Sequence, residues 1–157
     1  MPDTTVYAAL AILLGLLVGS FLNVVVYRLP RMMELGWAKE HAAYAAQQAG
    51  KEPTEATAEQ RFNLLTPPSS CRQCGHRVRW YENIPIISYL ALQGKCSSCK
   101  TPIGLRYPLV ELVTGAIAWW CFYRYGMHWH ALAWFFFGAT LLCLTSIDWD
   151  TTYLPHN

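Results

Sequence analysis

Three long apolar segments alternate with polar ones along the chain. Residues 6–27 contain no charged side chain and would rise about 33 Å as a helix, against roughly 30 Å of bilayer hydrocarbon. Residues 129–147 form a further apolar stretch that ends at Asp148. Residues 109–123 are shorter and include Glu111. The pattern predicts an all-α integral membrane protein with about three transmembrane helices, of which the middle one is the least apolar.

A polar region, residues 28–106, separates the first apolar segment from the second. It holds eleven of the twelve Lys and Arg residues but six of the ten acids. Arg28, Arg31 and Arg106 flank the spans, and positive residues beside spans stay cytoplasmic. We therefore expect the polar region and Asp148 to lie on the cytoplasmic side. The three arginines could also contact anionic headgroups, although a general positive-inside signal explains them more simply.

The first part of the polar region has two expected elements. Residues 33–48 are rich in Ala with interspersed Met, Leu and Trp, which predicts a separate helix ending near Gly50. Residues 51–60 consist mainly of Pro, Thr, Glu and Ala and are expected to form a solvated connector. The expected domains are therefore the first span, the cytoplasmic region 28–106, and a final unit, 107–157, with the other two spans.

Composition supports a membrane protein and argues against two other classes. Hydrophobic residues make up 54% of the chain and charged residues 14%, which is too apolar for intrinsic disorder. The formal charge of +2 provides no basic field on the scale that nucleic-acid binding requires. Lipid is therefore an expected partner and nucleic acid is not.

Four cysteines form two C-x2-C pairs in the polar region. Each pair can place two thiolates on one turn, and two such turns can supply the four sulfur ligands that tetrahedral zinc prefers. Two disulfides are the competing interpretation, but a reducing cytosol disfavours them. We expect a closed, structural zinc site of the zinc-ribbon type at Cys71, Cys74, Cys96 and Cys99.

The remaining histidine and cysteine side chains near these elements have simpler expected roles. His76 follows the first pair but would be a fifth ligand, so we expect it to be solvated. Cys121 and Cys143 fall inside predicted spans, where buried apolar packing is the expected role.

Acidic residues in or beside the spans are the candidates for chemistry. An unpaired carboxylate inside a span is costly, so Glu111 should pair with Arg106, stay protonated or face a polar interior. Asp148 and Asp150 end the third span and could simply cap it in the headgroup zone.

Small and polar residues in the first span predict helix packing. Asn23 could hydrogen-bond across helices, and Gly15, Gly19 and Ser20 provide a small-residue face. Packing in the core is the expected role of these residues.

Taken together, several strings resemble the bacterial type 4 prepilin peptidases over nearly the whole chain. Beside the paired cysteines, the matching strings are GSFLNVVVYRLP at 19–30, YENIPIISYL at 81–90, RYPLVELVTG at 106–115 and IDWDTTYLP at 147–155. The resemblance implies an inner-membrane aspartic endopeptidase. It would remove the leader of type IV prepilins and type II secretion pseudopilins on the cytoplasmic side. Many members also methylate the new amino terminus with S-adenosylmethionine.

The resemblance also assigns roles to particular residues. It places the first catalytic aspartate at Asp148 and the zinc ligands on the four paired cysteines, whereas it assigns no individual residue to S-adenosylmethionine. Two departures stand out. His156 occupies a position that is usually Asp, and the G-x-G-D motif that carries the second catalytic aspartate does not occur in the 157 residues. We therefore expect an amino-terminal half that is inactive alone.

Two other functions remain open at this point. Three spans could anchor a zinc-ribbon module that binds a partner without catalysis. Glu111 and Asp148 could instead form a proton-coupled transport pair, but three spans with one polar loop lack the paired halves of many transporters.

Overall fold

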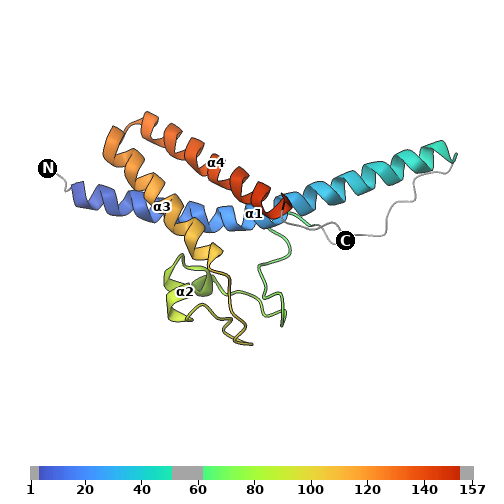
Figure 1. The fold of residues 1–157 in the computed structure, drawn as a ribbon, viewed down its shortest axis with the longest axis horizontal. Helices are drawn as coiled ribbons and strands as arrows, with labels where there is room; N and C mark the ends of the chain where they lie inside the picture. Colours follow the sequence, from blue (N-terminus) through green and yellow to red (C-terminus); the bar gives the residue numbers. More distant parts are fainter. Residues whose placement is uncertain (1–3, 51–61, 153–157) are drawn as a thin grey trace.

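The computed structural model describes residues 4–50 and 62–152 and places three long helices against one another (Figure 1). These are α1 (Thr4–Gln48), α3 (Arg106–Tyr125) and α4 (Trp129–Thr152). The cysteine region between α1 and α3 contains the short elements η1 (Trp80–Asn83) and α2 (Ile87–Ala91). Within the described residues, β structure is limited to two isolated bridges. The predicted all-α fold with a cysteine-rich insertion is confirmed.

Both segments predicted to be helical, 6–27 and 33–48, are helical, and they belong to one continuous helix, α1, whose continuity was not predicted. It passes through Pro30, a residue that costs about 3 kcal/mol inside a helix. The strong helix formers that follow, mainly Met, Leu, Ala, Glu, Lys and Gln, oppose this cost. The helix ends at Gln48 and Gly50 has a positive φ of 63°, as predicted. The predicted connector 51–60 lies outside the described residues.

The first two thirds of α1 pack against α3 and α4, while its last turns extend beyond them (Figure 1). Two small clusters form the core between these helices. One includes Leu22 and Cys143, and the other includes Cys121 and Phe135. Cys121 and Cys143 are both buried, which confirms the apolar packing role predicted for them.

Many large apolar side chains of the helices face outward. Leu10, Leu13 and Leu17 of α1 are each at least half exposed, and α4 exposes a similar set. Such extensive apolar exposure is typical of a surface that faces lipid. By length and composition, α1 and α4 could each cross a membrane, whereas α3 does not meet the same test among the described helices. The predicted membrane protein is thus supported, and the middle span stays a prediction.

Helices α1 and α3 approach most closely at two glycines of α1. A Cβ on Gly15 would lie 2.7 Å from the Cα of Gly115, and one on Gly19 would lie 2.7 Å from the Cα of Glu111. Asn23, one turn further along, donates a hydrogen bond to the carbonyl oxygen of Tyr107 at 3.0 Å. The predicted small-residue face and the predicted hydrogen bond across helices are both present.

Because α1 and α3 are so close at Gly19, the substitution Gly19→Ala tests their packing directly. The added methyl group would meet backbone rather than a flexible side chain, so we expect a loss of about 1–3 kcal/mol in unfolding free energy. Gly36→Ala is the matched control, because Gly36 lies in the same helix with nothing within 4 Å of its Cβ position. Thermal unfolding in detergent should show a lower midpoint for Gly19→Ala only. Equal midpoints for the two variants would contradict the packing described.

Candidate functional site

Each cysteine pair lies on a tight backbone turn. In the first, the amide of Cys71 donates to the carbonyl of His76 at 2.8 Å, and the amide of Gly75 donates to the carbonyl of Cys71 at 3.0 Å. The second pair repeats the arrangement, with the amide of Cys96 donating to the carbonyl of Thr101 at 2.9 Å. An isolated antiparallel bridge closes each turn. Two similar turns therefore present their thiols in the same way.

The two turns bring the four thiols together. The Sγ atoms of Cys71, Cys74, Cys96 and Cys99 all lie within 4.8 Å of one another, and all four thiols are free. The Sγ atoms of Cys71 and Cys99 are 3.7 Å apart. Zinc–sulfur bonds of about 2.3 Å in a tetrahedron would place the sulfurs about 3.8 Å apart, so this donor set fits a tetrahedral metal ion.

Local hydrogen bonds favour the thiolate form of two of these cysteines. The hydroxyl and the backbone amide of Thr101 lower the pKa of Cys99 to about 6. Backbone amides of Cys74 and Gln73 also lower the pKa of Cys71. Although a backbone hydrogen bond from His76 lowers it, desolvation and the neighbouring thiols together raise the pKa of Cys74 to about 11. The thiolate, which is the form that binds metal, is therefore favoured at Cys99 and Cys71 but not at Cys74.

His76 was predicted to be solvated, but the structure covers it in part. Its Nε2 lies 3.3 Å from the carboxylate of Glu82, and its side chain is only 26% exposed. The same carboxylate accepts a hydrogen bond from the amide of Arg79 at 2.8 Å, and this bond helps to lower the pKa of Glu82. The pair links the first cysteine turn to η1.

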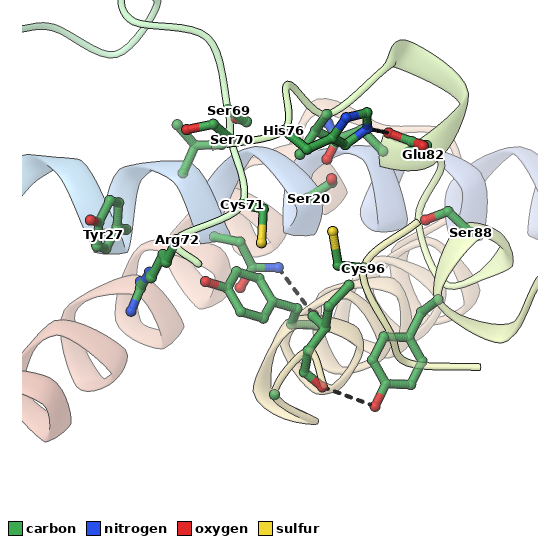
Figure 2. Close-up of a pocket in the computed structure, with 18 of the residues that line it drawn as sticks. Ser20, Tyr27, Ser69, Ser70, Cys71, Arg72, His76, Glu82, Ser88 and Cys96 are labelled. Atoms are coloured by element: carbon green, nitrogen blue, oxygen red, sulfur yellow. Dashed lines mark hydrogen bonds and ion pairs between the residues drawn. The ribbon is translucent and has the colours of Figure 1, made fainter. Parts of the chain in front are cut away.

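A cavity of about 830 Å³ lies between the cysteine region, α1 and the beginning of α3 (Figure 2). Cys71 and Cys96 face it from the two turns, and Ser20 lines it from α1 (Figure 2). Its α1 wall carries a polar stripe at helical spacing within an otherwise apolar region: Ser20, Asn23, Tyr27, Arg28 and Arg31. This stripe was missed in the sequence, although its i, i+3, i+7 spacing is the signal that would have identified it.

Glu111 faces this cavity and does not pair with Arg106, so that predicted pairing is wrong. Its carboxylate accepts a hydrogen bond from the amide of Ile86 at 2.8 Å, and the Ser20 side chain also interacts with it. Glu111 is 8% exposed and lines the cavity, which matches the alternative prediction of a polar interior.

Arg28 does not make the headgroup contact that was left open as the less simple alternative to a positive-inside signal. It is buried, and its guanidinium donates to the backbone carbonyls of Asn63 at 2.9 Å and of Pro67. It also lies over the ring of Phe62. Arg28 thus fastens the beginning of the cysteine region to α1.

Arg106 ties the end of α4 to the beginning of α3. It forms an ion pair with Asp150 and donates to the carbonyl oxygen of Ser146 at 3.3 Å. Arg106 therefore makes its contacts within the protein rather than with lipid headgroups. Because the cysteine region leads directly into α3, these contacts place exposed Asp148 at the same end of the helix bundle as that region. Asp148 does not line the cavity.

Comparison with known proteins gives consistent matches. The family described as Bacterial Peptidase A24 N-terminal domain matches residues 13–125. A prepilin leader peptidase/N-methyltransferase of Pseudomonas aeruginosa is 52% identical over 144 residues, which are 92% of this chain and 48% of that protein.

Proteins of the same description from other bacteria are also similar. One from Neisseria gonorrhoeae is 49% identical over 93% of this chain and 49% of its own length. One from Aeromonas hydrophila is 40% identical over 95% of this chain and 50% of its own length. The chain thus spans about half the length of these relatives. No solved structure matches it significantly.

Proposed function

Because the chain belongs to the prepilin peptidase family, with its bacterial A24 N-terminal domain over residues 13–125, we propose that it forms part of a leader-cleaving membrane endopeptidase. The proposed substrates are type IV prepilins and pseudopilins, cut at the cytoplasmic face of the inner membrane. The proposal also includes N-methylation of the cleaved product, an activity that the relatives' description names. Helix α3 is proposed as the second of three spans, between α1 and α4.

The position of Asp148 carries the peptidase proposal. The link from Arg106 to Asp150 and Ser146 holds the last turns of α4 beside the start of α3, and Asp148 lies within those turns. A carboxylate at this end of the bundle would meet a substrate at the membrane boundary, on the side where the flanking arginines predict the cytoplasm.

The proposed chemistry is that of an aspartic peptidase. Such an enzyme needs two nearby carboxylates, one ionised to take a proton from water and one neutral to hydrogen-bond the scissile carbonyl. Their mutual repulsion keeps one of them protonated. We assign one of these roles to Asp148, and the family resemblance assigns the other to an aspartate in a later G-x-G-D motif. One carboxylate cannot fill both roles.

We propose zinc as the ion held by the four clustered cysteines, because their spacing fits its tetrahedral geometry. With four protein ligands the site would be closed, so its role would be structural and the ion would take no part in cleavage. S-adenosylmethionine is the proposed methyl donor of the second activity.

Photo-crosslinking tests the proposed site of cleavage. The photoreactive amino acid p-benzoylphenylalanine replaces Trp149, the exposed neighbour of Asp148, in a complete peptidase that contains this segment. Trp134 is the matched control, an exposed tryptophan of the same helix about 22 Å further along. We expect a crosslink to a prepilin from position 149, within a few residues of the leader junction, and none from position 134. Equal crosslinking from both positions, or from 134 alone, would overturn the placement of the site.

A further inference from the structure

We propose that the cavity between α1 and the cysteine region binds the methyl donor, whose methionine part carries a sulfonium cation together with an α-ammonium and a carboxylate. This inference rests on the proposed N-methylation, and it adds a location and named residues. The cavity volume of about 830 Å³ lies within the range of roughly 300–1,000 Å³ that small-molecule and cofactor sites occupy. The charges at its two ends decide which kind of ligand it fits.

Glu111 forms the acidic end of the cavity. Gly19 allows α1 to approach the backbone of Glu111, and Ser20 follows on the cavity wall. The carboxylate is buried, yet within the described residues no cationic side chain is recorded against it, and its recorded partners are an amide and a hydroxyl. A buried carboxylate satisfied only by neutral groups is a suitable counter-charge for a bound cation.

The backbone that holds Glu111 is itself unusual. Ile86, whose amide donates to the carboxylate, has φ 59° and ψ −47°. A β-branched residue at this positive φ, outside the allowed left-handed helical region, is strained by about 1–3 kcal/mol, and such strain persists where surrounding contacts fix it, often at functional sites. Here the strained backbone directs the Ile86 amide toward the Glu111 carboxylate, which faces the cavity. This supports a site built around Glu111 rather than incidental space between helices.

Arginine side chains form the basic end of the cavity, around Tyr27. The guanidinium carbons of Arg72 and Arg31 lie 4.3 Å and 5.0 Å from the centre of the Tyr27 ring. Arg72 and Tyr27 lie together on one side of the cavity, away from His76 and Glu82 (Figure 2). Tyr27 is two helical turns from Ser20, about 10 Å along α1. The two arginines can therefore receive a carboxylate while Glu111 faces a cation.

This separation of charge suits a zwitterion better than a basic peptide. A peptide rich in Lys or Arg would meet the arginines at one end of the cavity, which like-charge repulsion disfavours. In the transfer, the amine nitrogen forms a bond to the methyl carbon as the carbon–sulfur bond breaks, and the bonding electrons remain on the sulfur of the departing thioether. The amine releases one proton to water. Glu111 would bind the positively charged donor more tightly than the neutral product. This difference in affinity assists the exchange of product for donor.

Equilibrium dialysis tests the inference with S-adenosylmethionine and its neutral thioether product, S-adenosylhomocysteine, as probes. The 157-residue chain is used in detergent micelles. We expect Glu111→Gln to weaken S-adenosylmethionine binding roughly tenfold or more, because a neutral amide does not offset the sulfonium charge as a buried carboxylate does, and to change product binding far less. The amide oxygen of Gln can still accept the hydrogen bond of Ile86. Arg72→Gln should weaken both probes similarly, because both carry the carboxylate.

Glu34→Gln is the matched control, since it makes the same chemical change on an exposed part of α1 that does not line the cavity. Its binding of both probes should equal that of the unchanged chain. Equal weakening of both probes by Glu111→Gln, or no S-adenosylmethionine binding by the unchanged chain, would overturn the inference. Leader cleavage by the complete protein is measured in parallel. Cleavage without donor binding would contradict the cavity assignment alone, whereas donor binding without cleavage would contradict only the peptidase proposal.

Discussion

Cys96→Ser is expected to remove the metal ion from the cysteine cluster and to loosen residues 62–105. Cys96 is buried, and its thiol is one of the four that converge within 4.8 Å. Structural zinc sites contribute about 10–16 kcal/mol of apparent binding free energy at neutral pH, which in small domains is folding free energy. Apart from the contacts of Arg28 and Glu111 with it, the described part of this region has a four-residue and a five-residue helix and two isolated bridges as its regular structure. Loss of one ligand should therefore destabilise the whole region.

Two measurements check this expectation. Metal analysis should find one zinc per unchanged chain and much less in Cys96→Ser, and hydrogen exchange of residues 62–105 should be much faster in the variant. Cys143→Ser is the control, because this cysteine is buried in α4, away from the cluster, and should leave the zinc content unchanged. Persistent protection of the region after complete metal removal would contradict a structural role, and so would metal-free chains with two intact disulfides.

Sequence patterns predicted the elements whose physical signal is local. The uncharged run in α1 and the apolar run in α4 each appear as helices of spanning length. The two C-x2-C pairs converge as their spacing indicated. In the first case the information lies within one continuous run of residues, and in the second it lies in two short motifs whose chemistry favours their meeting, so no knowledge of the tertiary fold was required.

The predictions that failed concern partners far apart in sequence. Pairing with Arg106, five residues away, was one of three alternatives expected for Glu111, but Arg106 pairs with Asp150, 44 residues away. Glu111 instead accepts an amide from Ile86, a contact that only the fold of the cysteine region creates. The continuity of α1 through Pro30 was missed for a different reason. A proline usually interrupts a helix, and here a long run of good helix formers outweighs it.

The cavity could be predicted from the sequence only in part. Its polar stripe from Ser20 to Arg31 follows helical spacing and could have been recognised in the sequence. The arginines of that stripe were instead assigned to the membrane boundary, because positive residues beside spans have a strong topological explanation. What the sequence could not reveal is that the cysteine region folds back over this face of α1.

Asp148→Asn in a complete peptidase that contains this segment should lower the rate of leader cleavage by about 10²–10⁴-fold, the usual contribution of a positioned general acid or base. The amide is nearly isosteric with the carboxyl group, so the helix should remain intact. It cannot take a proton from water, and this is the role that the two-carboxylate mechanism requires of one member of the pair.

Asp150→Asn is the matched control, with the same chemical change two residues further along α4. It breaks the ion pair with Arg106, whose two side chains are 39% and 40% exposed. Pairs this exposed contribute about 0–1 kcal/mol, so cleavage should fall by no more than roughly fivefold. The contrast separates a residue that performs chemistry from one that positions the helix.

Leader cleavage of a prepilin by these two variants, measured beside the unchanged protein, is the most direct test of the account. The account predicts that Asp148→Asn is nearly inactive while Asp150→Asn retains most of the rate. Normal cleavage by Asp148→Asn, or an equally severe loss in both variants, would contradict it.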